Sequence, residues 1–167
     1  MAKIKVALMA IWVAVPVNGS TAADRGAAEI MVTITNLETA KGEVRCALFR
    51  GPEGFPRKPE RATFRVVGVI EGEVGRCVFT GIAPGHAAIT VSHDENNNKK
   101  LDMRMGFIPS EGIGWSNNPK VRFAPPSFEQ ARFVVGAPPL HGYPPQPAVI
   151  VVVLHGRHTA KPARMPS

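Results

Sequence analysis

The chain has 167 residues, of which 44% are hydrophobic, and this length allows one domain with a hydrophobic core but not two comfortable ones. It carries 20 Lys and Arg residues against 13 Asp and Glu residues, for a formal net charge of +7. No basic patch is interleaved with aromatic residues, so we do not expect nucleic acid as a partner.

The first 23 residues have the pattern of a secretory signal peptide. Two lysines precede an apolar run over residues 6–17, and small residues follow as far as Ala23. The alternative is a membrane anchor, which needs about 20 apolar residues, whereas this run is shorter and contains Pro16. We therefore predict export to the periplasm or beyond the cell, with cleavage near Ala23 and no membrane span afterwards.

Residues 24–156 have the pattern of one all-β domain. Most of its predicted strands alternate apolar and polar residues with a period of two, and turns rich in Gly and Pro separate them. The predicted strands cover residues 29–35, 43–49, 62–70, 75–80, 86–93, 128–135 and 148–154. We predict an antiparallel seven-stranded β-sandwich, with a small closed barrel as the alternative.

Three segments depart from the alternating pattern. The last predicted strand, 148–154, is a β-branched run that indicates a central strand covered on both faces. A long irregular flap between strands five and six, from Met103 to Ser127, is too long for a plain connector and too apolar for a disordered one. Residues 157–167 lack apolar periodicity, and we predict a disordered basic tail there.

The two cysteines of the chain both point inward in the predicted strands. Cys46 shares a strand face with Val44 and Leu48, and Cys77 shares one with Phe79. An exported chain meets an oxidising compartment, which favours a disulfide between Cys46 and Cys77. The alternative is two buried thiols that act as small apolar fillers.

Four motifs follow one another along the chain: K-G-E-V-R-C-A-L-F, P-G-x-x-A-x-x-V-x-H-D-E-N-x-N-x-K-L-D, G-F-I-P-S-E-G-I-G-W-S-N-N and F-A-P-P-S-F-E-Q-A-R-F. In this order they resemble the exported bacterial family called domain of unknown function 2141, over roughly residues 30–154. The resemblance implies an exported β-sandwich of immunoglobulin-like or transthyretin-like type, and it implies no activity. The chain departs from the family pattern at Asn97 and Lys99, where the family usually has glycine.

The asparagine-rich segment after strand five has the spacing of a cation loop. Five residues supply oxygen ligands at that spacing: Asp94, Asn96, Asn98, Lys100 through its carbonyl, and Asp102. Hard oxygen ligands at alternate positions are typical of a wrapping Ca²⁺ loop. However, Lys99 stands where such a loop has glycine, and Met105 stands where it has the closing glutamate. The segment is therefore either a weak calcium loop or a turn held by hydrogen bonds from Asx side chains.

His93 allows two chemical interpretations besides a structural one at the end of its strand. As the acid or base of a metal-dependent hydrolase it would act with one of three partners: Glu95, Glu111 or Ser116. As a ligand of a periplasmic copper-handling protein it would join two thioethers: Met103 and Met105. No nucleophile elbow or HExxH motif supports the enzyme, and methionines also serve as apolar fillers.

The flap either caps one end of the sandwich or forms a binding surface, and both roles are compatible. In the second role Trp115 would stack on a ligand such as a carbohydrate. His93 and three flap residues would lie around it: Asn117, Asn118 and Arg122. We predict a non-enzymatic binding or accessory module of the cell envelope, whose partner is a carbohydrate or another envelope protein.

Overall fold

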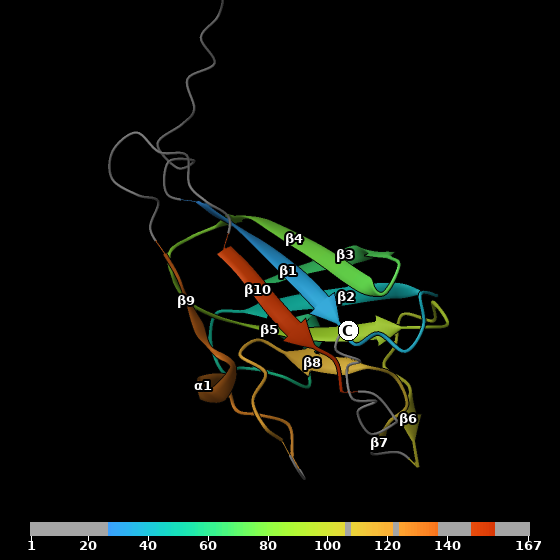
Figure 1. Cartoon of the computed structure of the whole chain (residues 1–167). Coiled ribbons are helices and arrows are strands. Elements are labelled where there is room, and N and C mark those ends of the chain that lie inside the picture. Colours follow the sequence, from blue (N-terminus) through green and yellow to red (C-terminus); the bar gives the residue numbers. More distant parts are fainter. Residues whose placement is uncertain (1–26, 106–107, 122–123, 137–147, 156–167) are drawn as a thin grey trace, which may run out of the picture.

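The computed structural model describes residues 27–105, 108–121, 124–136 and 148–155 (Figure 1). The predicted signal peptide, the predicted basic tail and Arg122 lie outside the described residues. Within the described part, no helix has the length and apolar character needed to cross a membrane.

The regular secondary structure of the described chain is almost entirely β-strand, as the alternating pattern predicts. The strands are β1 (Ala28–Thr35), β2 (Glu43–Phe49), β3 (Phe64–Glu71), β4 (Val74–Ile82), β5 (Gly85–Asp94), β6 (Met103–Arg104), β7 (Ile108–Pro109), β8 (Ile113–Trp115), β9 (Phe133–Val135) and β10 (Ala148–Val153). Two short helices accompany them, η2 (Pro59–Arg61) and α1 (Phe128–Ala131).

Eight of these strands form one sheet that is nearly closed into a barrel-like shape. Its order is β10-β1-β4-β3-β2-β5-β8, and β9 pairs with β5 away from this path. The first part of β3 pairs with β2 and the last part with β4, so β3 belongs to both halves of the sheet. An isolated bridge between Ile113 and His155 brings the two ends of the path together.

The all-β prediction is confirmed, but the sheet is mixed and not purely antiparallel. β1 runs parallel to β10, with Ile30 opposite Ala148 and Thr35 opposite Val153. A parallel neighbour must come from a distant part of the chain, because two parallel strands need a long crossover connection. The alternation within each strand carries no information about such a partner, and the prediction of an antiparallel seven-stranded sandwich was wrong in this respect.

Local structure between residues 103 and 135 also differs from the prediction. Residues 128–135 begin as helix α1, and only Phe133–Val135 forms strand β9. Ser127 caps this helix by accepting a hydrogen bond from the Gln130 backbone N–H, and Gln130 caps Ser127 in return. This capping box, S-x-x-Q, is a helix-start signal in the sequence. The flap itself contributes β8 to the main sheet and is not wholly irregular.

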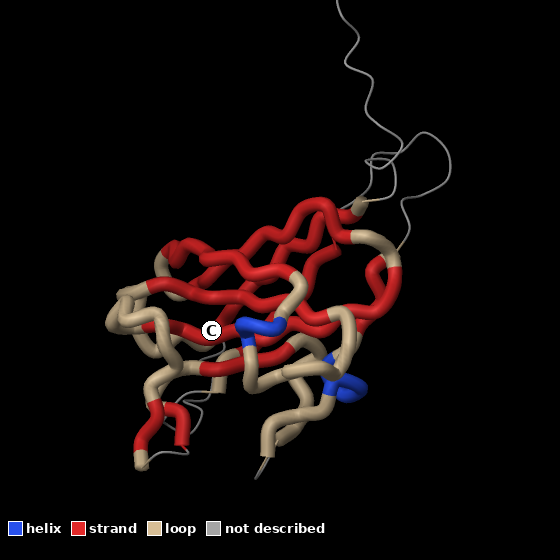
Figure 2. The backbone as a smooth tube through the Cα atoms, turned by 180° about the vertical axis from the view of Figure 1, so that it is seen from behind, coloured by secondary structure: helices blue, strands red, loops and turns tan. Residues whose placement is uncertain are grey.

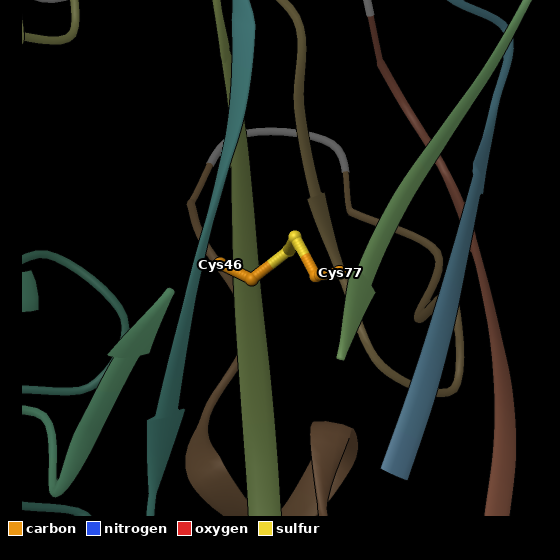
Figure 3. Close-up of a disulfide and its surroundings, with 2 residues drawn as sticks. All are labelled: Cys46 and Cys77. Atoms are coloured by element: carbon orange, nitrogen blue, oxygen red, sulfur yellow. A yellow bond between two sulfur atoms is a disulfide. The ribbon is translucent and has the colours of Figure 1, made fainter. Parts of the chain in front are cut away.

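The main core lies inside the barrel, between its two halves. It contains buried residues of six strands, among them Ile30 and Ile34 of β1, Phe79 of β4 and Leu48 of β2, and β3 packs partly buried residues against it. Cys46 on β2 and Cys77 on β4 form a disulfide across this interior (Figure 3), with Cα atoms 6.5 Å apart. The predicted disulfide is therefore confirmed in this structure. Closing a loop of 31 residues restricts the unfolded chain by about 3.5 kcal/mol on the chain-entropy model.

A second, smaller core covers the outer side of β2, β5 and β8. Phe49, Ala88 and Trp115 of these strands pack against Phe128 and Ala131 of α1. Phe55 adds edge-on contacts with the rings of Phe49 and Phe128. Figure 2 shows this side of the molecule, with both short helices and their loops lying beside the sheet. The half of the sheet that contains β5 and β8 is thus buried on both of its faces.

Candidate functional site

The predicted cation loop connects the end of β5 to β6, at one end of the barrel. β5 ends at Asp94, which lies opposite Glu43 at the start of β2. Asn97 and Lys99 have positive φ angles of 58° and 66°. Glycine adopts such angles without strain, so the backbone at these two positions is one that would accept glycine.

Asp94 is buried, and its carboxylate organises the loop that follows it. One oxygen accepts a hydrogen bond from the Asn98 backbone N–H at 3.0 Å, and the other accepts one from the Lys99 N–H at 2.7 Å. The second oxygen also lies 3.3 Å from Nε of Arg45. The Asp94 carboxylate therefore binds the backbone of its own loop and a neighbouring guanidinium.

Asp102 closes the loop from its other end. Its two oxygens accept hydrogen bonds from the side-chain amides of Asn96, at 2.8 Å, and Asn98, at 3.0 Å. The amide oxygen of Asn96 accepts from the Asn98 N–H, and that of Asn98 accepts from the Lys100 N–H. The side chains predicted as cation ligands thus lie together and bond to one another and to the loop backbone. This is the geometry expected of the alternative, an Asx-held turn.

Glu111 lies outside this loop but binds it, and the sequence analysis missed that role. It precedes β8, is buried, and accepts hydrogen bonds from the backbone N–H groups of Glu95, at 3.2 Å, and Asp102, at 3.1 Å. Burial raises the pKa of this carboxyl, the two backbone N–H groups lower it, and the charges of Asp102 and Asp94 raise it further. Glu111 therefore holds both ends of the loop, and three carboxylates lie close enough to interact.

His93 is fully buried at the end of β5, where its ring faces the core. Nε2 lies 2.7 Å from the Lys41 carbonyl oxygen, and a carbonyl only accepts, so Nε2 carries the ring proton. Nδ1 has no hydrogen-bond partner among the described residues. The structural interpretation of His93, a strand-end histidine tied to a neighbouring loop, matches this environment.

The proposed partners of His93 do not join it in a reactive arrangement. The Ser116 hydroxyl accepts from the Ile89 N–H at 2.9 Å and donates to the Ala131 carbonyl at 2.6 Å. Within the described part of the chain it forms no hydrogen bond with His93. Met103 and Met105 are exposed, whereas His93 is sealed from solvent. Within the described residues, no group of three or more His, Cys, Asp or Glu side chains is arranged to hold a metal ion.

The motif W-S-N-N, residues 115–118, connects separate parts of the fold. Trp115 is 5% exposed and lies in the second core, with its ring centroid 5.8 Å from that of His155. Asn117 donates to the Arg132 carbonyl at 2.6 Å. Asn118 donates to the Val151 carbonyl and accepts from the Val153 N–H, at 2.9 and 2.8 Å. Trp115 exposes no ring face for a stacked ligand, and both asparagine side chains are engaged with backbone.

The comparison with protein families gives the same family that the four motifs indicated. Residues 32–141 match the model of the family described as "Uncharacterized protein conserved in bacteria (DUF2141)". The chain belongs to this family. No curated protein and no solved structure matches the chain. The family is bacterial, and its description assigns no activity.

Proposed function

We propose that this protein is a non-enzymatic binding or accessory module of the bacterial cell envelope, and that its loop 94–102 binds Ca²⁺ weakly. The observation that carries the calcium proposal is that Asp94, Asp102 and Glu111 all hydrogen-bond to groups of one short loop, with two of the three carboxylates buried. Within the described residues these carboxylates are not arranged around an ion, so binding requires the loop to rearrange. Like charges at a shared site disfavour ionisation of each other. A divalent cation offsets that repulsion.

The ligands we propose are Asp94, Asn96, Asn98, the Lys100 carbonyl and Asp102, with Glu111 in place of the closing glutamate that the loop lacks. A flip of the Asn96 and Asn98 amides would turn their oxygens toward the Asp102 carboxylate and open a set of oxygen ligands. The bonds that already hold the loop must be exchanged for bonds to the ion. We therefore expect weak affinity, in the range of extracellular modules, with Kd of about 10⁻⁴ to 10⁻³ M.

Thermal unfolding tests the calcium site. The parent protein should melt at a higher temperature with millimolar Ca²⁺ than with EDTA, because an ion that binds only the folded state stabilises it. Mg²⁺ should substitute poorly, since it demands a smaller octahedral shell. Asp102→Asn should abolish the calcium shift, whereas Glu73→Gln, which removes an exposed carboxylate from the β3–β4 turn, should keep it. A shift of equal size in the parent and in Asp102→Asn would leave only an Asx-held turn.

The envelope location rests on the Cys46–Cys77 disulfide, because disulfides persist in oxidising compartments and are rare in the cytosol. The N-terminal pattern of residues 1–23 supports the same proposal. Cell fractionation followed by intact-mass measurement tests it. We expect a chain without residues 1–23 in the periplasmic or extracellular fraction, and a full-length chain retained in the cytosol would refute export.

We also propose that the two halves of the barrel correspond to the two layers of an immunoglobulin-like or transthyretin-like sandwich. The core between the halves and the disulfide that joins them support this interpretation. An experimental structure tests this proposal. In a sandwich β3 should pair with only one of its two neighbours, β2 or β4. Pairing of β3 with both strands would indicate a barrel and contradict the proposal.

A further inference from the structure

A pocket of about 290 Å³ lies where β2 ends and β3 begins. Six residues line it: Phe49, Arg50, Gly51, Glu53, Arg61 and Thr63. The Thr63 N–H donates to the Leu48 carbonyl at 2.9 Å, so the two strand ends are joined at this point. The loop 94–102 lies at the other end of β2, because Glu43 at the start of β2 is opposite Asp94. The pocket is therefore separate from the proposed calcium loop.

The Arg50 guanidinium is held in a fixed position beside the pocket. Its Nη2 donates to the carbonyl oxygens of Ala83 and Pro84, both at 2.8 Å, which ties it to the turn between β4 and β5. Nη1 is buried and has no hydrogen-bond partner among the described residues. A charged donor withdrawn from water without an acceptor costs free energy. An acceptor oxygen brought to Nη1 by a ligand would offset that cost.

Segment 50–65, which forms most of the pocket, carries an excess of positive charge. It contains five basic residues, Arg50, Arg57, Lys58, Arg61 and Arg65, against two acidic ones, Glu53 and Glu60. The ion pairs of the described residues involve three other arginines, Arg45, Arg76 and Arg132, so none of these five is paired with a carboxylate. A cleft lined by charges of one sign concentrates ions of the opposite sign. The segment therefore attracts an anion.

The polar groups of the pocket suit a carboxylate. The guanidinium groups of Arg50 and Arg61 are planar forks of N–H donors that match the two oxygens of a carboxylate, and the Thr63 hydroxyl adds a further donor. Arg61 and Thr63 are exposed, so a ligand reaches them from solvent. The lining contains two arginines and one glutamate, for a formal charge of +1. Because Glu53 repels each negative charge of a ligand, a monoanion fits better than a dianion.

We propose that this pocket binds a small carboxylic acid as its anion, through Arg50, Arg61 and Thr63. Pockets for drug-sized ligands have volumes of about 300 to 1,000 Å³. A volume of about 290 Å³ therefore admits an acid no larger than roughly a monosaccharide. Since Nη1 of Arg50 is buried, the carboxylate must displace the side chains that cover it. This rearrangement lowers the affinity, and we expect a Kd in the millimolar range.

NMR titration of the protein with glucuronate, at constant ionic strength, tests the proposal. Saturable shifts should appear at the backbone amides of Gly51 and Thr63 and at the Nε–H group of Arg50. Glucuronamide, which has a similar shape and no charge, should produce no such shifts. Arg61→Gln removes one of the two guanidinium groups, and it should weaken glucuronate binding about tenfold or more, as expected for a hydrogen bond to a charged group.

Arg65→Gln is the matched control, because it removes an exposed basic residue of the same segment that does not line the pocket. It should change the Kd for glucuronate by no more than about twofold, since salt screens charges outside the pocket. Thr63→Val keeps the shape of the side chain and removes its hydroxyl. It should weaken binding by a smaller factor than Arg61→Gln.

The absence of saturable shifts at tens of millimolar glucuronate would overturn the proposal, as would equal shifts with glucuronamide. Equal weakening in Arg65→Gln and Arg61→Gln would show that glucuronate responds only to the general charge of segment 50–65, and would also overturn it. Tighter binding of inorganic phosphate than of glucuronate would contradict the choice of a carboxylate. Circular dichroism of each variant separates lost binding from lost folding.

Discussion

The two outer sides of the sheet differ in what they bury and what they expose. Outside β2, β5 and β8, the large side chains Phe49, Trp115 and Phe128 are covered by a second core. Outside β10, β1, β4 and β3, valines lie in solvent. The buried polar residues of the described chain follow the same division, since all of them lie on β5 or on β8 and its flanks: His93, Asp94, Glu111 and Ser116.

The two halves of the sheet also differ in how loops and short helices are attached to their strands. We call the half that contains β2, β5 and β8 the covered half. In the covered half, polar side chains attach irregular segments to the strands, as Ser116 does by binding both Ile89 and Ala131. Such attachment allows a loop and a short helix to bury aromatic rings outside the barrel. The other half, β10-β1-β4-β3, has regular strands on both sides of β1, and the side chain that attaches a loop to it, Asn118, binds β10 at the end of the sheet path. We call this the bare half. On its outer side valines are exposed to solvent, whereas the outer side of the covered half is packed against the second core.

The largest effect should follow from emptying the second core. Trp115→Ala removes a buried ring that packs between the sheet and α1, and we expect a loss of about 3–5 kcal/mol in the free energy of unfolding. Val69→Ala on the bare half removes side-chain volume that is already 60% exposed, and a change within about 0.5 kcal/mol is expected. Urea unfolding of both variants measures the contrast. Similar losses in the two variants would show that the halves do not differ as described.

The strands of the barrel could be predicted from the sequence more accurately than the segments that pack on the outside of β2, β5 and β8. Period-two alternation placed β1 to β5 within a few residues of their bounds, and inward parity brought Cys46 and Cys77 to the same interior. Alternation reports which face of a strand is buried, and a core strand shows it over many residues. The three residues of β8 are too few to show a period.

The errors have physical causes in particular residues. The apolar run of β10 indicated a strand covered on both faces, but Val149, Val151 and Val153 are exposed. Hydrophobicity alone cannot distinguish a strand covered on both faces from one with a face exposed to solvent. Asn117 and Asn118 were expected to face a ligand. Instead, the Asn117 amide binds backbone of the segment after α1, and the Asn118 amide binds backbone of β10. That assignment requires the tertiary arrangement, because the bonded groups lie far apart in the sequence.

A smaller effect should follow from cutting the link between the two halves. Asn118 has a positive φ of 45°, so Asn118→Gly keeps the backbone conformation and removes only the side chain that binds β10. Two hydrogen bonds at an exposed edge are lost and water replaces part of them, so we expect a loss of about 1 kcal/mol. The amide of Val153, which Asn118 accepts from at 2.8 Å, should exchange its hydrogen faster.

Asn117→Gly is the control for this link. Asn117 also has a positive φ, of 63°, but its side chain binds the Arg132 carbonyl and not β10. Its removal should leave the exchange rate of the Val153 amide unchanged. Equal acceleration in the two variants would mean that Asn118 does not hold the edge of β10 and that the barrel closes by other contacts.

The smallest effect concerns the buried carboxyl of Glu111, in the covered half. Its pKa in the folded protein is raised above the ordinary value of 4.5, chiefly by burial. The folded state therefore binds this proton more tightly than the unfolded state, and the resulting stability is present below the ordinary value and lost as pH rises through the raised one. Glu111→Gln removes that pH dependence and loses one backbone acceptor at every pH. Urea unfolding at a series of pH values should show the stability difference between parent and Glu111→Gln shrinking as pH rises from about 4.5, by less than about 1.4 kcal/mol per pH unit. The exposed Glu73 supplies the control, since Glu73→Gln should differ from the parent by a nearly constant amount. A constant difference for Glu111→Gln as well would show that Glu111 is ionised equally in the folded and unfolded chains.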